Sequence, residues 1–357
     1  MAKKKKTSYN PLYYYPNKLF SYDPKKYYYY ICIGSRGRGK TVSAWRWVLK
    51  RYLKYGEQFI WLRLTEAPIK KASRNQGTTL VPEFLLKQLK IEGVTMRGSV
   101  IYMTVKEKGK TVSKQIGMMD SISTFYTSKG QDMSRYTNVI FDEINRESGE
   151  RNTFDLTRAF INQIETIARM RTMRVMMLGN TISDTSEILG LFNFQPKKFG
   201  LYKLSRKHCI IEYLEDSEDF KKKRKKSLAG ILLGDNQDVA TSFTNTATNY
   251  NDNVFKYNDK LKQVFIFYIG EFKAYGIYSM AGLGKKYNRD GLYIGEIRTK
   301  DTPAFKLSPF LNCEGKYDRQ IYDAFYELVS TNSLYFETTL DRSRFIKALK
   351  NNTRSLM

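Results

Sequence analysis

Eight residues near the N-terminus have the types and spacing of a phosphate-binding loop. They spell Gly-Ser-Arg-Gly-Arg-Gly-Lys-Thr, with glycine in the first and sixth positions and lysine and threonine at the end. Glycines let backbone N–H groups wrap a phosphate, the lysine reaches the β- and γ-phosphates, and the threonine hydroxyl can ligate Mg²⁺. The predicted nucleotide-binding residues are Gly34, Ser35, Arg36, Gly37, Arg38, Gly39, Lys40 and Thr41.

A second pattern, further along the chain, could complete this site. Asn138–Phe141 has the pattern of a short buried strand, and Asp142 and Glu143 follow it directly. We predict that Asp142 and Thr41 hold Mg²⁺ and that Glu143 polarises the attacking water as a general base. A glutamate in this position is typical of ATP-hydrolysing machines, and the sequence has no Asn-Lys-x-Asp motif for guanine. The predicted ligands are therefore ATP and Mg²⁺.

Two further polar side chains are predicted to lie near the phosphates. The next core strand ends at Gly179 and Asn180, and Asn180 either senses the γ-phosphate or only makes a turn. Its place one strand beyond the acidic pair favours the sensor. Arg63 ends the second strand, where its guanidinium would point toward the nucleotide edge of the sheet.

Ring-shaped motors complete their sites with an arginine of a neighbouring subunit, which stabilises charge in the transition state. Arg169 and Arg171 are the candidates here, and Arg158 and Arg174 are weaker ones. The alternative is that such arginines only pair with a helix end. Lys129 lies in a polar loop, where it either contacts a neighbour's nucleotide or DNA or is simply solvated.

These residues need a parallel sheet that brings strand ends to one edge. Tyr27–Ile33 has high β-propensity, Lys40–Tyr55 has a helical pattern closed by Gly56, and Gln58–Leu64 is a second strand. Strand, helix and strand in this order form the βαβ unit of a parallel sheet. Further predicted elements are a hairpin of Val100–Lys106 and Thr111–Gly117, a helix over Asp155–Met170 and a strand over Arg174–Gly179.

The rest of the chain is predicted to form a smaller α+β domain. Asp219–Lys226 is a basic run and residues 235–252 are rich in Asn, Thr and Asp, so we predict a linker over 214–250. The predicted class is α/β, with a P-loop ATPase domain and N-terminal arm over 1–213 and a C-terminal α+β domain over 251–357. The elements predicted in that domain are strands over Gln263–Ile269, Ala274–Met280 and Gly291–Ile297 and helices over Asp318–Ser330 and Asp341–Lys350.

The charge balance predicts a polyanionic partner. Among 357 residues, 61 Lys and Arg stand against 35 Asp and Glu, which gives a formal net charge of +26. Nucleic acid is the commonest partner for such an excess, the alternative being a lysine-rich composition without that purpose. Three distant cysteines and one histidine argue against a zinc site or a disulfide framework. No apolar run is long enough to span a membrane.

Together these motifs resemble the DNA-packaging ATPases of small tailed phages of the phi-29 type, a branch of the additional-strand P-loop ATPases. The segments that carry the resemblance are YPNKLFSYDPKK, RYLKYGEQFIWLR, VIFDEINRE and MRVMMLGN. The resemblance implies a RecA-like ATPase domain and a ribonuclease-H-like C-terminal domain that has lost its nuclease activity. It also implies a trans-acting lysine at Lys129 and a trans-acting arginine next to Arg169, at Ala168.

The same resemblance implies a homo-pentameric ring at the portal vertex of a procapsid in the host cytoplasm. The ring would thread double-stranded DNA inward with ATP hydrolysis, and in some relatives a structural RNA is a further partner. Alternatives are a helicase or a translocase of the FtsK or HerA type, a nucleoside or small-molecule kinase, and a scaffold that binds nucleotide only to assemble. The residues predicted to contact DNA are Lys70, Lys71, Arg74, Lys108 and Lys110.

Overall fold

The computed structural model describes residues 13–16, 18–124, 130–145, 154–180, 186–194, 198–233, 253–269, 273–283 and 290–353. The chain divides into two units. The first unit comprises Met1–Ser183 and Lys198–Thr246, and the second comprises Asp184–Lys197 and Ala247–Met357. In the described part of the chain, no helix is both long enough and apolar enough to cross a membrane.

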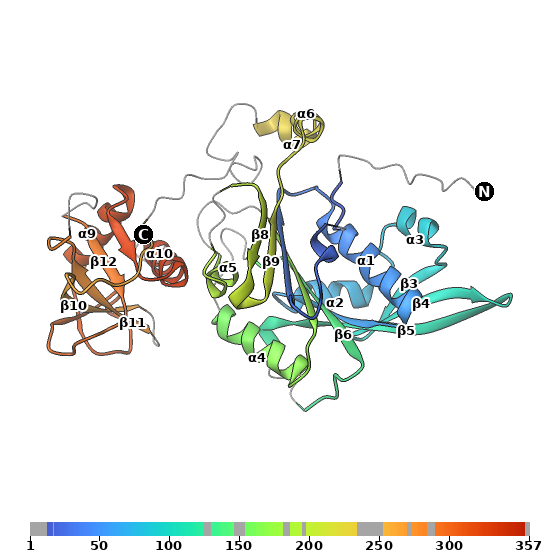
Figure 1. The fold of residues 1–357 in the computed structure, drawn as a ribbon, viewed down its shortest axis with the longest axis horizontal. Helices are drawn as coiled ribbons and strands as arrows, with labels where there is room; N and C mark the ends of the chain where they lie inside the picture. Colours follow the sequence, from blue (N-terminus) through green and yellow to red (C-terminus); the bar gives the residue numbers. More distant parts are fainter. Residues whose placement is uncertain are drawn as a thin grey trace. The chain divides into compact units, whose positions relative to one another are not determined.

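The described residues of the first unit form a nine-stranded sheet in the order β3-β4-β5-β2-β6-β7-β1-β9-β8 (Figure 1). From β5 to β9 in this order every neighbouring pair is parallel. The outer strands β3, β4 and β8 pair antiparallel. The bounds are β1 Tyr29–Gly34, β2 Gln58–Arg63, β3 Gly93–Arg97, β4 Val100–Glu107, β5 Lys110–Ser121, β6 Tyr136–Asp142, β7 Arg174–Asn180, β8 Gly200–Leu204 and β9 Cys209–Tyr213.

Strand β7 lies between β1 and β6, and this position sets the geometry of the predicted site. Gly34 of β1 is in register with Asn180 of β7, and Asp142 of β6 is in register with Leu178 of β7. Because parallel strands present their carboxyl ends at one edge, Gly34, Asp142 and Asn180 lie at the same edge of the sheet. An extra strand between the phosphate-loop strand and the acidic strand confirms the predicted additional-strand α/β fold.

Helices cover both faces of this sheet because successive strand residues point to opposite sides. On one face, α1 (Lys40–Tyr55) stacks the buried Trp45 on Trp61 of β2, with ring centroids 4.3 Å apart. On the other face, α4 (Leu156–Ala168) stacks Phe160 on Phe141 of β6 at 5.5 Å. Truncating a buried tryptophan to alanine costs roughly 3–5 kcal/mol. The helix that follows the phosphate-binding loop is therefore firmly held on the sheet.

The predicted bounds of α1 are confirmed at both ends. After Tyr55, Gly56 adopts a φ of 69° and donates its N–H to the carbonyl of Tyr52 at 2.8 Å. Such a left-handed C-cap favours glycine, which has no Cβ to clash. The other described helices of the first unit are α2 Ala67–Arg74, α3 Glu83–Leu89, α6 Glu218–Lys225 and α7 Leu228–Leu233, with short 3-10 turns at Leu19–Ser21 and Ser205–Lys207.

The described residues of the second unit form a mixed sheet in the order β14-β13-β10-β11-β12-β15. Strands β10, β11 and β12 are antiparallel neighbours, whereas β13 is parallel to β10. A mixed sheet with helices agrees with the α+β class predicted for the C-terminal part of the chain. The bounds are β10 Lys262–Ile269, β11 Lys273–Ser279, β12 Leu292–Gly295, β13 Ala304–Lys306, β14 Lys316–Tyr317, β15 Leu334–Phe336, α5 Glu187–Leu191, α9 Arg319–Ser330 and α10 Thr339–Thr353.

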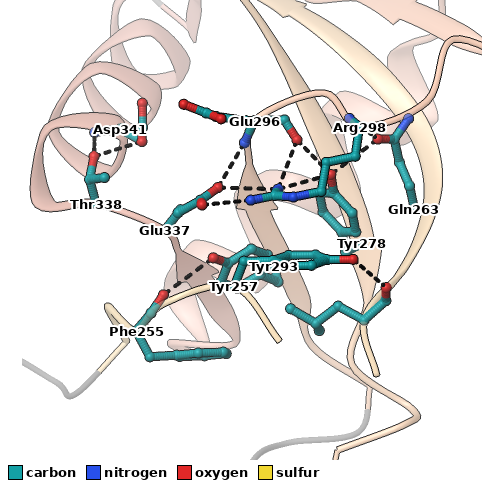
Figure 2. A network of polar contacts seen from close by, with 11 residues as sticks. Phe255, Tyr257, Gln263, Tyr278, Tyr293, Glu296, Arg298, Glu337, Thr338 and Asp341 are labelled. Carbon is teal, nitrogen blue, oxygen red and sulfur yellow. Dashed lines mark hydrogen bonds and ion pairs between the residues drawn. The ribbon is translucent and has the colours of Figure 1, made fainter. Parts of the chain in front are cut away.

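A polar and aromatic network joins the strands of the second unit (Figure 2). The guanidinium of Arg298 lies 3.6 Å from the ring centroid of Tyr257 and donates to Glu337 at 2.7 Å. The carboxylate of Glu337 also accepts the N–H of Glu296 at 2.9 Å, and Tyr278 donates to the carbonyl of Glu296. These groups satisfy one another, so we assign the network to stability. Across the described residues of the whole chain, no three His, Cys, Asp or Glu side chains gather to hold a metal.

Several elements differ from the predicted ones. Strand β5 runs to Ser121, beyond the predicted Gly117, because its second half pairs with β2 in the parallel sheet. Strand β1 begins at Tyr29 and not at Tyr27, and β12 is shorter than Gly291–Ile297. The sequence patterns do not predict the following elements, most of which are short: β3, β8, β9, β13, β14, β15, α2, α3, α5, α6 and α7. Helices α6 and α7 lie within the predicted linker 214–250, and the predicted domain limits stay a prediction.

Candidate functional site

The phosphate-binding loop folds tightly between β1 and α1. Gly37 and Gly39 have φ of 82° and 77°, a region that side chains with a Cβ rarely adopt. The side chain of Lys40 folds back onto the loop, where its Nζ donates to the carbonyls of Gly34 at 2.8 Å and Ser35 at 2.9 Å. The glycines thus provide the curvature, and the lysine amine lies at the centre of the loop.

Burial alters the electrostatics of Lys40. The residue is 7% exposed, and loss of water lowers the pKa of its amine from 10.5 to about 8. The negative charges of Asp142 and Asp216 oppose this shift. A buried cation whose hydrogen-bond acceptors are neutral oxygens would gain from an anionic ligand. The site therefore favours a phosphate group electrostatically.

The predicted magnesium ligands lie next to each other. The hydroxyl of Thr41 donates to the carboxylate of Asp142 at 3.2 Å, and Asp142 is 2% exposed. Burial raises the pKa of Asp142, against the lowering influence of Arg63 and Thr41. A hydroxyl and a carboxylate are oxygen donors of the kind that Mg²⁺ accepts, together with water and phosphate oxygens. The two residues fit this ion.

Arg63 joins the two acids at the end of β6. Its Nη1 lies 2.7 Å from Oδ2 of Asp142, and its Nη2 lies 2.9 Å from Oε2 of Glu143. Arg63 thus points toward the acidic pair, and its predicted role in nucleotide binding stays a prediction. One guanidinium therefore fixes the separation of the metal-binding candidate and the candidate base.

Glu143 occupies an unfavourable backbone conformation. Its φ is 62°, and its side chain is 52% exposed, in contrast to the buried Asp142. The N–H of Ile144 donates to the carbonyl of Leu178 on β7 at 3.0 Å and holds the turn. A left-handed conformation costs a non-glycine residue roughly 1–3 kcal/mol and is concentrated at functional sites. The turn aims Glu143 away from the core, where a water molecule can reach it.

Asn180 lies beside the lysine, and its predicted role as a sensor of the γ-phosphate stays a prediction. Its Oδ1 accepts from Nζ of Lys40 at 3.2 Å, and its carbonyl accepts from the side chain of Asn145 at 3.2 Å. Asn145 is a contact that the sequence patterns do not predict. Asn180 thus connects the phosphate-binding lysine with the segment that follows Glu143.

The two arginine candidates lie far from this site. Arg171 and Arg169 precede β7, whose seven residues span roughly 23 Å and end at Asn180. Arg171 donates to the carbonyls of Met133 at 2.9 Å and Ser134 at 2.7 Å, and also to those of Tyr136 and Ile167. Arg169 is exposed, has a φ of 51° and makes a long contact, 3.4 Å to the carbonyl of Gln131. Neither arginine can serve the site of its own subunit.

The other basic candidates fall into two groups. Lys70, Lys71 and Arg74 are exposed on α2, which follows the carboxyl end of β2. Lys108 and Lys110 are exposed at the turn of the β4–β5 hairpin, which extends beyond the rest of the sheet (Figure 1). Strand β5 has 12 residues, so about 35 Å separates its two ends. The structure therefore does not bring the two groups together, and Lys129 lies outside the described residues.

The weaker arginine candidates have partners within the first unit. Arg174 donates to Glu57 at 2.6 Å and to Asn138 at 2.9 Å. The backbone N–H of Arg158 donates to the side chain of Asp155, which caps α4.

Sequence patterns also miss a contact with the phosphate-binding loop: Ser35 donates to Asp216 at 2.7 Å. An acidic residue in a loop carries no signal of such a partner 181 positions away.

The strand order β9-β1-β7-β6-β2, with a glycine-rich loop after β1 and an acidic pair at the end of β6, defines the fold of the additional-strand P-loop ATPases. A family model described as "Podovirus DNA encapsidation protein (Gp16)" matches residues 9–299. The chain belongs to this family.

Individual relatives are similar over part of their length. The "DNA packaging protein" of Bacillus phage phi29 and that of Bacillus phage PZA are each 29% identical over 227 residues. The match covers 62% of this chain and 62% of each relative, so this chain spans less than two thirds of their length.

Two solved structures share the fold. The structure titled "The Phi-28 gp11 DNA packaging Motor" matches with a TM-score of 0.61 and 18% identity over 96% of this chain and 99% of that one. The structure titled "The bacteriophage Phi-29 viral genome packaging motor assembly" matches with a TM-score of 0.57 and 21% identity over 95% and 99% of the two chains.

Proposed function

We propose that this protein hydrolyses ATP to move double-stranded DNA into a viral procapsid. The observation that carries the proposal is the set of side chains at one sheet edge. At this edge Lys40 contacts Asn180, and Arg63 pairs with both Asp142 and Glu143. A binding site alone would need the lysine, whereas hydrolysis also needs an acid placed to take a proton from water.

In the proposed reaction, backbone N–H groups of the loop and Lys40 bind the β- and γ-phosphates. Bound Mg²⁺, held by Thr41 and Asp142, would neutralise charge on the phosphate oxygens. Glu143 accepts a proton from water as the water oxygen forms a bond to the γ-phosphorus. The bond from that phosphorus to the ADP oxygen breaks, and ADP and phosphate are the products. Arg63 positions both acids and would yield part of its contact with Asp142 to the ion.

A neighbouring subunit would complete the site. Of the two arginine candidates, we favour Arg169, because Arg171 is fully engaged with backbone carbonyls of its own subunit. Lys129 is proposed as a second contribution in trans. A closed ring lets every subunit receive an arginine from its neighbour. We propose a pentameric ring at the portal of a procapsid in the host cytoplasm.

Double-stranded DNA is the proposed track, gripped by its phosphates without sequence preference. The net charge of +26 supports a polyanionic partner, and the exposed basic residues of α2 and the hairpin supply contacts. The names of the relatives, which are DNA packaging proteins, support the same track. A structural RNA at the portal is a further proposed partner, and the C-terminal unit is proposed to lack nuclease activity.

Three other functions are less well supported by the site. A kinase would transfer the phosphate to a hydroxyl acceptor, but the exposed Glu143 directly after Asp142 is suited to activating water. A scaffold that only binds nucleotide would not need that strained glutamate. Other translocases, such as helicases, share this chemistry and differ in the track.

Steady-state ATP hydrolysis, with and without duplex DNA, tests the proposal on the parent protein and on Glu143→Gln. We expect the parent to hydrolyse ATP and duplex DNA to stimulate it. We expect Glu143→Gln to lower kcat by about 10²–10⁴-fold, because glutamine cannot accept the proton. Nucleotide affinity should change by less than about threefold, since the ground-state contacts remain.

Glu83→Gln is the matched control, because Glu83 is an exposed glutamate that pairs with Lys87 on the surface of α3. It should leave both kcat and DNA stimulation unchanged. Hydrolysis that is absent in the parent, or equal in Glu143→Gln, would refute the motor. Stimulation by a small hydroxyl acceptor in place of DNA would favour the kinase.

A further inference from the structure

One face of helix α6 lies on the phosphate-binding loop. The residues of this face are Asp216, just before the helix, Phe220 and Arg224, spaced four positions apart. Residues at that spacing share one side of a helix. All three contact the loop between Ser35 and Arg38, although about 180 residues separate them from it in sequence.

Asp216 makes the closest of these contacts. Its two carboxylate oxygens lie 2.7 Å and 2.8 Å from the hydroxyl of Ser35, which donates to them. Both residues are buried, Ser35 at 1% exposed and Asp216 at 5%. A hydrogen bond to a carboxylate away from water is stronger than one between neutral groups. The second residue of the loop is thus fixed to the start of α6.

The next contacts extend along the loop. Nε of Arg38 lies 3.5 Å from the Asp216 carboxylate, and its guanidinium lies 4.9 Å from the ring centroid of Phe220. Further along the helix, Arg224 donates to the carbonyl of Arg36 at 3.0 Å. The loop backbone that must wrap a phosphate is therefore held on one side by α1 and on the other by α6.

The opposite sides of α6 carry a different chemistry. Lys221, Lys222, Lys223 and Lys225 are exposed there. The helix begins with the N-cap Ser217, whose side chain accepts the N–H of Phe220. The cap keeps Asp216 and the helix in a fixed relation. A displacement of the loop would therefore displace a helix that presents a basic surface.

We propose that Asp216 is a positioning residue for ATP binding, and that nucleotide in the phosphate-binding loop is coupled through Asp216 to helix α6. The inference rests on the proposed function and names a residue outside the two phosphate-site motifs. Asp216 acts through Ser35 and Arg38, the two loop residues that its carboxylate contacts. Because coupling between two sites is reciprocal, a ligand on α6 would alter nucleotide affinity by the same factor.

The first test measures nucleotide affinity and turnover for Asp216→Asn. Asparagine keeps the size and one acceptor but removes the charge toward Arg38 and Ser35. We expect KM for ATP and Kd for ADP with Mg²⁺ to rise about tenfold, the equivalent of one charged hydrogen bond. The value of kcat should change by less than about threefold, because the loop contacts ground state and transition state alike.

The second test measures backbone hydrogen exchange of α6 with and without saturating ADP and Mg²⁺. In the parent, nucleotide should slow exchange of the α6 amides about tenfold, the same factor as the expected loss of affinity. In Asp216→Asn at equal saturation, the slowing should be lost. An equal slowing in Asp216→Asn, or none in a parent that binds nucleotide, would overturn the inference while leaving the proposed function in place. A parent that binds no nucleotide would overturn both.

Asp341→Asn is the matched control in the second unit. Asp341 is also a buried carboxylate, 7% exposed, that pairs with Lys273 at 2.7 Å and accepts from Thr338 at 2.6 Å. Its replacement should lower the melting temperature as much as Asp216→Asn does, without changing KM or the response of α6. A rise of KM in Asp341→Asn equal to that in Asp216→Asn would mean that loss of stability explains both, and the positioning assignment would fall.

Discussion

Strands β2, β6 and β7 carry polar clusters at both of their ends, and the two clusters differ in how their charges are paired. At the amino ends, Glu57 accepts from Arg51, Asn138 and Arg174, and Arg174 also stacks on Trp47 at 5.4 Å. Each of these charges has an opposite charge of the same protein beside it. This cluster is complete without a ligand.

At the carboxyl ends of the same strands, the pairing is different. The ammonium of Lys40 has neutral oxygens as its acceptors, and Asp142 and Glu143 share the guanidinium of Arg63. Glu57 has its pKa lowered to about 2, whereas burial raises that of Asp142. The difference separates a cluster that stabilises the fold from one that is arranged to receive a charged ligand. Variants that disturb each cluster separately test this division.

The largest effect is expected for Lys40→Ala. Removal of a charge that stabilises the transferred phosphate should lower kcat/KM by about 10²–10³-fold. Stability should change by less than about 1 kcal/mol, because a desolvated cation is removed together with its hydrogen bonds. Steady-state hydrolysis and urea unfolding measure the two quantities. A large loss of stability in Lys40→Ala would mean that the carboxyl-end cluster also supports the fold.

Glu57→Gln should have the opposite profile. Its loss leaves Arg51 and Arg174 without their anion, and we expect a decrease of about 2 kcal/mol in the free energy of unfolding, below the roughly 3–5 kcal/mol for fully buried pairs. Activity per folded molecule should be unchanged. The exposed pair of Glu83 with Lys87 supplies the control, since Glu83→Gln should cost no more than about 0.5 kcal/mol.

The carboxylate of Glu57 should also make the free energy of unfolding depend on pH. Because the folded-state pKa of Glu57 is about 2 against an ordinary 4.5, its stabilisation is full above pH 4.5 and is lost as the pH falls toward 2. The difference in stability between parent and Glu57→Gln should therefore shrink over that range. A difference that stays constant from about pH 6 to about pH 3 would contradict the assigned pairing.

A smaller effect is expected from the pH dependence of nucleotide binding. With a pKa of about 8, Lys40 is mostly charged at pH 7, whereas about one molecule in ten keeps the charge at pH 9. The apparent Kd for ATP should therefore rise about tenfold between these values, as only the charged form binds well. Lys40→Arg, whose guanidinium stays charged, should show a flat profile. Equal profiles for both proteins would place the titrating group elsewhere.

The smallest effects concern DNA. Replacing Lys70, Lys71 and Arg74 by glutamine should reduce the slope of log K against log salt by about 0.9 for each DNA phosphate that is no longer neutralised. The same holds for Lys108 and Lys110 at the other end of the strands. Filter binding at several salt concentrations compares the two variants. A change in only one of the variants would show which end of the sheet faces the duplex.

The sequence predicts those parts of the site that depend on local chemistry. The loop at Gly34–Thr41, the bounds of α1 and the acids after β6 follow from glycine spacing, helical period and an apolar run. The structure brings Lys40 into contact with Asn180 and Thr41 into contact with Asp142. Their catalytic assignments stay predictions until the kinetic tests are made.

Contacts between distant segments are harder to predict. The bond between Ser35 and Asp216 joins a loop residue to an acid in a polar stretch, and neither has a distinctive pattern. Arg171 is engaged by backbone carbonyl groups, whereas Arg169 makes one long contact. Only the folded backbone determines which carbonyl groups lie near each guanidinium. Short strands such as β9 gain their stability from pairing with β1 and carry little local signal.

The backbone of Glu143 has a consequence for any selection of robust variants. At a φ of 62°, glycine would relieve a cost of roughly 1–3 kcal/mol, so Glu143→Gly should make the first unit more resistant to heat. A directed-evolution screen that rewards thermal tolerance alone would therefore enrich variants that lack the proposed general base. At the turn after β6, selection for the proposed activity would keep glutamate, whereas selection for thermal stability would favour glycine.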